Sequence, residues 1–220
     1  MAIRVTTDVV VFTFQDSRLQ VLLVRRRNAP YRGLPALPGG FVENREPLER
    51  AALRELKEET GLRGVSVEQL STFGDPHRDP RGRTISVVHL ALVAPGRPLR
   101  AGSDAAAVGW WPVDELPRMA FDHRCIVDCA VEHLRDQLDY TTAGFQLLPR
   151  KFSLPELQAL YESVLGRKLD KRNFRKKMDL LGILKPRNEW RRTGRKPARL
   201  YSFVPAKFEK FKEKGILFPF

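Results

Sequence analysis

Residues 40–62 read GFVENREPLERAALRELKEETGL, a loop phrase followed by a helical pattern. Pro47 suits the first position of a helix and Gly61 its end, so the sequence predicts a helix of about three to four turns between them. Leu53 and Leu56 recur at helical spacing and form an apolar stripe that can face a core. The rest of the helix surface is therefore free to carry polar side chains.

That polar surface carries three carboxylates. Glu55 lies three residues before Glu58 and four before Glu59, so the three side chains are neighbours on the helix. Like charges so close repel one another, and a hard cation relieves the repulsion because Mg2+ binds carboxylate oxygens together with water and phosphate. Arg54 could orient one carboxylate through a charge-assisted hydrogen bond. The alternative is a solvated acidic face on which Arg54 and Lys57 act as counter-charges.

The spacing of the whole stretch favours the metal site over the solvated face. From Gly40, five residues lead to Glu46, and seven more lead to the phrase RELKEETGL, which begins at Arg54. The pattern resembles the Nudix box, Gx5Ex7REUxEExGU with U an aliphatic residue, at every specified position. The resemblance implies a Mg2+-dependent pyrophosphohydrolase.

The same resemblance assigns roles to particular residues. It assigns Mg2+ (or Mn2+) to the three glutamates, and the catalytic group to Arg54, Glu55, Glu58 and Glu59. The phrase TFGDPHRDPRGR at 72–83 and the strand pattern after it resemble the ADP-ribose-pyrophosphatase-like branch of the family. From the residues alone, the arginines of this loop either clamp a phosphate or belong to an ordinary hairpin tip. The resemblance implies a substrate pocket formed by Arg78, Asp79 and Arg81, with Gly39 and Gly40 allowing close backbone approach.

The N-terminal part of the chain alternates strand and helix patterns. Residues 7–24 read as a hairpin, 65–73 and 84–93 as two further strands, and 123–138 as a second helix. Strands around the acidic helix, with a second helix behind them, give an α/β fold: a mixed sheet in an α/β/α sandwich. This is also the fold that the Nudix box implies.

The three adjacent arginines and one histidine of this part are expected to have at most a supporting role in the site. Arg25, Arg26 and Arg27 follow the predicted hairpin. Adjacent arginines most often mark the solvated end of a strand, and less often they meet an anion. His123, at the start of the second helix, is expected in the cap region or behind the site rather than as the catalytic base.

Charge divides the chain into two unequal parts. Residues 141–220 contain 20 Lys and Arg against 7 Asp and Glu, a net charge of +13, whereas residues 1–140 contain 19 of each. A basic segment of this size is typical of a nucleic-acid binder, with an anionic membrane surface as the competing partner. No apolar run is long enough to span a bilayer, no signal peptide is recognised, and the two cysteines fit a reducing compartment. We therefore expect a cytoplasmic protein that does not attach to membranes.

The basic segment predicts a winged helix-turn-helix. Ser153 and Glu156 form a capping box at the start of one helix. Asp170 and Gly182 bracket a second helix over 171–181 whose first half is basic. A second helix of this kind, after a short turn, suits the recognition helix that enters the major groove.

Two strand patterns, 183–186 and 199–203, follow as a hairpin with a basic tip that would act as a wing on phosphate or the minor groove. We place the domain boundary after residue 143, which gives a Nudix hydrolase-like domain at 1–143 and a winged-helix DNA-binding domain at 144–220. The candidate DNA-binding residues are Lys171, Arg172, Asn173, Arg175, Lys176, Arg191, Arg192, Arg195 and Lys196.

Together the two parts resemble one family, the Nudix-related transcriptional regulators of NAD metabolism. The phrases FSLPELQALYESVLGRKLDKRNFRKKM and GRKPARLYSF carry the resemblance in the C-terminal part. It implies a Nudix domain that binds, and with its intact box hydrolyses, ADP-ribose or a related nucleoside diphosphate derivative. It also implies a homodimer and a palindromic operator in double-stranded DNA. The alternatives are a pyrophosphohydrolase with no regulatory role, a catalytically silent ADP-ribose sensor, and an RNA-processing Nudix enzyme.

Overall fold

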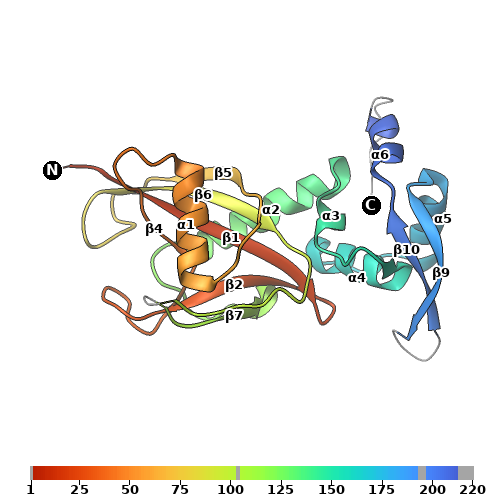
Figure 1. The fold of residues 1–220 in the computed structure, drawn as a ribbon, viewed down its shortest axis with the longest axis horizontal. Coiled ribbons are helices and arrows are strands. Elements are labelled where there is room, and N and C mark those ends of the chain that lie inside the picture. The colour runs from red at the N-terminus through yellow and green to blue at the C-terminus, as the bar shows by residue number, and fades with distance from the viewer. Residues whose placement is uncertain (1, 103–104, 193–196, 213–220) are drawn as a thin grey trace. The chain divides into compact units, whose positions relative to one another are not determined.

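The computed structural model describes residues 2–102, 105–192 and 197–212 (Figure 1). Its internal contacts divide the chain into two compact units. The first comprises Met1–Thr13 and Gln20–Val131, and the second comprises Phe14–Leu19 and Glu132–Phe220.

The first unit is built on a mixed β-sheet. Among the described residues it has seven strands: β1 (Arg4–Gln15), β2 (Arg18–Arg26), β3 (Pro35–Ala36), β4 (Gly39–Phe41), β5 (Glu68–Phe73), β6 (Thr84–Leu92) and β7 (Ala105–Pro112). The order is β3-β2-β1-β6-β5, with β4 paired to β1 and β7 paired to β2. β6 runs parallel to β1 and antiparallel to β5, so the predicted mixed sheet is confirmed.

Helices cover both faces of this sheet. α1 (Leu48–Thr60) lies in front of the strands, and α2 (His123–Tyr140) begins behind them (Figure 1). Val9 and Val11 of β1 pack in one core cluster with Leu56 of α1. Val10 and Phe12 are also fully buried, and because side chains alternate along a strand they face the other side. The α/β/α sandwich that the sequence predicts is therefore present, with a short 3-10 helix, η1 (Val113–Glu115), after β7.

The ends of α1 follow the predicted signals closely. Pro47 is the N-cap residue rather than the first helical residue, and Gly61 is the C-cap with a left-handed φ of 73°. Two backbone amides from a distant loop complete the end of the helix. Arg100 N–H donates to the carbonyl of Thr60 at 2.8 Å, and Gly102 N–H donates to that of Glu59 at 3.1 Å.

The second unit contains the winged helix. Its elements after α2 are α3 (Ala143–Gln146), β8 (Phe152–Ser153), α4 (Leu154–Leu165), α5 (Lys171–Leu181), β9 (Leu184–Arg192), β10 (Pro197–Phe203) and α6 (Pro205–Lys212). The capping box of Ser153 and Glu156 is confirmed at the start of α4. Asp170 caps α5, where it accepts a hydrogen bond from Asn173 N–H at 2.8 Å. Phe174 of α5 is buried against Tyr161 of α4.

The wing strands are longer than the sequence predicts. β9 and β10 are antiparallel, and their pairing extends to Arg192 opposite Pro197. The prediction stopped earlier because the charged phrase in β9 has low strand propensity, whereas the ladder with β10 keeps it extended. Arg191 and Arg192 therefore lie within a strand instead of at the hairpin tip. Arg195 and Lys196 lie outside the described residues.

Candidate functional site

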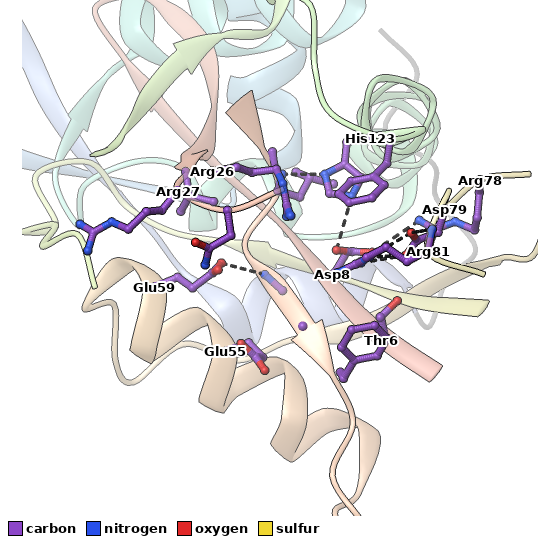
Figure 2. A pocket seen from close by; sticks show the side chains of 18 of the residues that line it. Thr6, Asp8, Arg26, Arg27, Glu55, Glu59, Arg78, Asp79, Arg81 and His123 are labelled. Atoms are coloured by element: carbon purple, nitrogen blue, oxygen red, sulfur yellow. Dashed lines mark hydrogen bonds and ion pairs between the residues drawn. The ribbon is translucent and has the colours of Figure 1, made fainter. Parts of the chain in front are cut away.

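A cavity of about 430 Å³ opens in the first unit, lined by residues of α1, β1, β4 and the loop after β5 (Figure 2). All the residues predicted to bind substrate line it: Gly39, Gly40, Arg78, Asp79 and Arg81. Three of the four predicted catalytic residues line it as well, namely Arg54, Glu55 and Glu59. Glu58 is not among the lining residues, and its side chain is 59% exposed.

The two carboxylates in the cavity are held by different donors. Gly39 N–H donates to Glu59 Oε2 at 3.0 Å, and Arg54 Nη1 donates to Glu55 Oε1 at 2.7 Å. Burial raises the pKa of Glu55 despite the ion pair with Arg54. Burial also raises the pKa of Glu59, to about 8. Both shifts have the same origin. Loss of hydration disfavours the charged form of a carboxyl group unless a cation compensates.

The donor set of the cavity fits a hard divalent cation. A Cβ on residue 40 would lie 2.3 Å from Glu55 Oε1, so the glycine at this position leaves the carboxylate room to face the cavity. Two carboxylates with space for water and phosphate match the coordination of Mg2+. Within the described residues, no group of three or more His, Cys, Asp or Glu side chains is arranged to hold a metal ion. Glu55 and Glu59 would therefore leave coordination positions to be filled by further ligands.

Arg54 connects the loop before α1 to the helix through hydrogen bonds. Its Nε and Nη2 donate to the two oxygens of Glu46, both at 2.9 Å, and Nη2 also donates to the carbonyl of Phe41 at 3.2 Å. The hydrogen bonds from Arg54 lower the pKa of Glu46, and those to Glu46 raise the pKa of Arg54. Arg54 thus holds the loop before α1, and the end of the strand β4 that carries the two glycines, in place beside Glu55.

The arginine loop is rigid because its charges are paired. Arg78 is buried and donates to both oxygens of Asp122, at 2.9 and 2.7 Å. Arg81 Nη2 donates to Asp79 Oδ2 at 2.7 Å. Burial opposes ionisation of Asp79, but the hydrogen bonds from Arg81 hold its pKa below the ordinary value. The loop therefore presents positioned guanidinium groups to the cavity.

Arg26 also lines the cavity, and the sequence prediction gave it too little weight. Its guanidinium lies over the Phe121 ring at 4.8 Å, and that of Arg81 lies over the same ring at 5.3 Å. Arg26 Nε donates to the carbonyl of Pro30 at 2.9 Å, and no carboxylate of the described residues forms an ion pair with it. Burial lowers the pKa of Arg26, and Arg81 lowers it further by repulsion. The signal was the run of three arginines at the end of the hairpin.

Asp8 and His123 form the inner wall of the cavity (Figure 2). Leu37 N–H donates to His123 Nδ1 at 2.9 Å, so this nitrogen carries no proton, and Nε2 faces Asp8 Oδ1 at 3.6 Å. Burial lowers the pKa of His123. Ser86 Oγ donates to Asp8 Oδ2. His123 lies at the start of α2 as expected, and Asp8 was missed although an aspartate inside an apolar strand was a visible signal.

The second unit presents the predicted basic residues of α5 to solvent. Lys171, Arg172, Asn173, Arg175 and Lys176 are all exposed, while Phe174 and Met178 on the opposite side are buried. Of the wing residues, Arg191 and Arg192 are both exposed, and Arg191 also donates to Glu156 Oε1 at 3.0 Å. No helix of the described residues is long and apolar enough to cross a membrane.

Two family models match the chain, the NUDIX domain at residues 3–128 and the NrtR DNA-binding winged helix domain at residues 144–203. These matches define the class of protein, a Nudix domain joined to a DNA-binding winged helix. The chain is 34% identical over 203 residues to the ADPR responsive transcriptional repressor NtrR of Acinetobacter baylyi, covering 90% of this chain and 81% of the relative. The chain belongs to the Nudix family, in the group of NrtR regulators.

Two further proteins support this assignment. The ADP-ribose pyrophosphatase of Methanocaldococcus jannaschii is 45% identical over 108 residues, which cover 49% of this chain and 63% of the relative. The crystal structure of Shewanella oneidensis NrtR complexed with a 27mer DNA has 34% identity and a TM-score of 0.75, covering 93% of this chain and 95% of that one. The NUDIX domain of the same protein complexed with ADP ribose has 39% identity and a TM-score of 0.57, covering 61% and 90%.

Proposed function

We propose that the chain is a transcriptional regulator whose Nudix unit binds ADP-ribose or a related nucleoside diphosphate derivative and whose winged-helix unit binds double-stranded DNA. The observation that carries the proposal is the presence, in one chain, of a charge-lined cavity and an exposed basic helix. The relative from Acinetobacter baylyi, which matches across both units, is an ADPR responsive repressor. The family resemblance implies that the genes controlled by this chain belong to NAD metabolism.

The cavity can recognise a pyrophosphate through its arginines. Arg26 and Arg81 lie over the same Phe121 ring and repel one another. A diphosphate between them would remove the repulsion and accept charge-assisted hydrogen bonds. Gly39 and Gly40 allow the ligand to approach the backbone, while Arg78 and Asp79 keep the arginine loop in position.

Regulation requires that ADP-ribose bind more tightly to one arrangement of the protein than to another. The DNA-bound form is a homodimer, because two recognition helices match the two-fold symmetry of a palindromic operator. We also propose that the domain boundary lies after residue 143, the first residue of α3. The protein acts in the cytoplasm.

The test measures DNA binding with and without ADP-ribose. The full-length chain is titrated against a short duplex that it has itself enriched from a randomised pool, and ADP-ribose is then added. We expect ADP-ribose to change the affinity by at least about fivefold, and Arg26→Ala to weaken this response. Arg124→Ala is the matched control, because Arg124 is an exposed arginine of α2 that does not line the cavity. An affinity that ADP-ribose leaves unchanged contradicts the regulatory role.

A second function, hydrolysis of the bound ligand, is favoured by the carboxylates in the cavity. Glu55 and Glu59 would hold Mg2+ or Mn2+, with Glu58 turning inward as a third ligand. The cation supplies positive charge to the pyrophosphate oxygens and lowers the pKa of water. Arg54 orients Glu55, and Gly39 N–H orients Glu59. The reaction would add water across the pyrophosphate of ADP-ribose and release AMP and ribose 5-phosphate.

The hydrolytic function is tested by AMP release from ADP-ribose, with and without Mg2+. We expect metal-dependent release that Glu59→Gln lowers by at least about a hundredfold, since the substitution removes a charged ligand. Glu58→Gln distinguishes a three-glutamate site, which requires an equal loss, from a site formed by Glu55 and Glu59. Binding of ADP-ribose without any AMP release would identify a silent sensor instead of an enzyme.

A further inference from the structure

One large aromatic side chain of the second unit is exposed to solvent. Trp190 of β9 has 65% of its surface exposed. Within the described parts of the chain, its indole forms no hydrogen bond, ion pair or ring contact. Trp110 of β7, by contrast, packs against a core cluster. Burial of an indole is most favourable when its apolar rings are covered and its N–H meets a hydrogen-bond acceptor. The side chains around Trp190 therefore indicate which partner can cover it.

Two ion pairs fix the orientation of β9. Glu189 accepts from Lys151 Nζ at 2.7 Å, and Arg191 donates to Glu156 Oε1 at 3.0 Å. Both partners lie around β8 and the first turn of α4, so these two side chains point toward the body of the unit. Because successive side chains of a strand point to opposite faces, Trp190 points away from that body.

The face that carries Trp190 is positively charged. Arg192 follows two residues later on the same face, and Arg199 of β10 lies directly opposite Trp190 in the strand register. Glu189, which points to the other face, is the only acidic residue in β9 or β10. A partner that covers this face must therefore combine negative charge with a surface for the indole.

Duplex DNA has both properties, because its phosphates alternate with deoxyribose and with the walls of the grooves. The same unit presents the exposed basic half of α5, and the NrtR DNA-binding winged helix match at 144–203 includes Trp190. We propose that Trp190 is a DNA-contacting residue of the wing, packing its indole on sugar or groove wall between phosphates held by neighbouring arginines. This inference rests on the proposed DNA-binding function and extends it to a contact that is not ionic.

An ionic contact and an indole contact differ in their response to salt. Each phosphate contact releases counterions and steepens the dependence of affinity on salt, whereas an apolar contact contributes equally at every salt concentration. Trp190→Ala should therefore weaken binding of the full-length chain to the enriched duplex by roughly tenfold at all salt concentrations. The slope of log affinity against log salt should stay unchanged. Arg192→Ala is the comparison variant, and it should reduce the slope.

Trp190→Phe keeps a ring and should retain most of the affinity, which separates loss of contact from loss of folding. Ile3→Ala removes an exposed apolar side chain of the first unit and should bind as the wild type does. Wild-type affinity in Trp190→Ala overturns the inference while leaving DNA binding intact. If the wild-type chain enriches no duplex at all, the proposed DNA-binding function fails together with the inference.

Tryptophan emission gives a second, direct measurement. The emission of Trp190 is obtained by subtracting the spectrum of Trp190→Phe from that of the wild type, and we expect the duplex to quench or shift it. Two outcomes overturn the inference in favour of another partner. Phosphatidylserine vesicles that change this emission while the duplex does not would indicate a membrane surface. A Trp190→Ala variant that becomes monomeric in sedimentation would indicate a contact between two copies of the chain.

Discussion

The cavity and the basic helix both present cationic side chains, but they hold them in opposite ways. In the cavity, Arg54, Arg78 and Arg81 each donate to a carboxylate at distances of 2.7–2.9 Å. On α5, Arg172 and Arg175 are exposed and form no ion pair with a described residue. Paired guanidinium groups have a fixed direction, so they select a ligand by shape. Unpaired groups attract any polyanion, with a strength that depends on salt.

The largest expected effect of this difference is on stability, at Arg78. Arg78→Ala removes a buried guanidinium, so that Asp122 loses a paired cation and Asp8 loses a neighbouring one. We expect the free energy of unfolding to fall by about 3–5 kcal/mol, measured by urea denaturation of the full-length chain. Arg124→Ala breaks the exposed pair with Asp128 and should cost about 0.5 kcal/mol or less. Equal costs for the two variants would contradict the view that burial makes the ion pairs of the cavity arginines more important for stability than an exposed pair.

A smaller effect is expected from pH, through His123. Burial lowers the pKa of His123 from its ordinary value of 6.5, and Leu37 N–H occupies Nδ1. Below pH 6.5 the unfolded chain therefore binds a proton that the folded chain does not. Stability should fall as pH decreases below that value, by at most about 1.4 kcal/mol per pH unit from this group. Asp8 and Asp122 favour the proton and Arg78 and Arg26 oppose it, but burial dominates.

The measurement compares urea midpoints of the wild type and His123→Gln between about pH 7.5 and about pH 5.5. The variant should lose part of the pH dependence. A remainder is expected, because burial also lowers the pKa of His89 and raises the pKa of Glu59 to about 8, and protonation of Glu59 opposes the loss of stability as pH falls. His77→Gln, at an exposed position, is the control and should keep the wild-type dependence. An unchanged dependence in His123→Gln would show that this histidine takes up its proton equally in the folded and unfolded states, so that burial does not lower its pKa.

The smallest effect concerns single charges on the DNA-binding surface. Arg175→Ala should lower the salt slope of duplex binding by about 1, as expected for one phosphate contact. Arg191→Ala should change it less, because Glu156 already neutralises this guanidinium at 3.0 Å. Duplex titrations at several salt concentrations give both slopes. A larger change at Arg191 would mean that its ion pair opens when DNA binds.

Much of the fold could be predicted because its signals are local. The two ends of α1, the capping box of α4 and the Asp170 cap of α5 depend on residues within a few positions of one another. The arginine loop was predicted from the family resemblance, and its residues Arg78, Asp79 and Arg81 line the cavity. The length of β9 was underestimated because pairing with a second strand overrides the low propensity of charged residues.

The rest of the candidate site depends on contacts between distant segments. Arg26 meets Phe121 only after β2 and the start of α2 are brought to the same cavity. Glu59 faces the cavity whereas Glu58 faces solvent, because the sheet and β4 cover only one side of α1. Helical spacing alone does not show this difference, since it predicts that the glutamates are neighbours. The pairing of Arg191 with Glu156 likewise becomes visible only once the wing is folded against α4.

The loop that closes the end of α1 limits how sequences of this family can be recombined. Gly102 lies against the last turn of the helix, where an added Cβ would be 1.8 Å from the carbonyl oxygen of Glu58. A chimera that receives the Nudix box from a relative must therefore keep a glycine at position 102. The exposed residues 96–98 just before them are, by contrast, a place where the chain can accept an insertion.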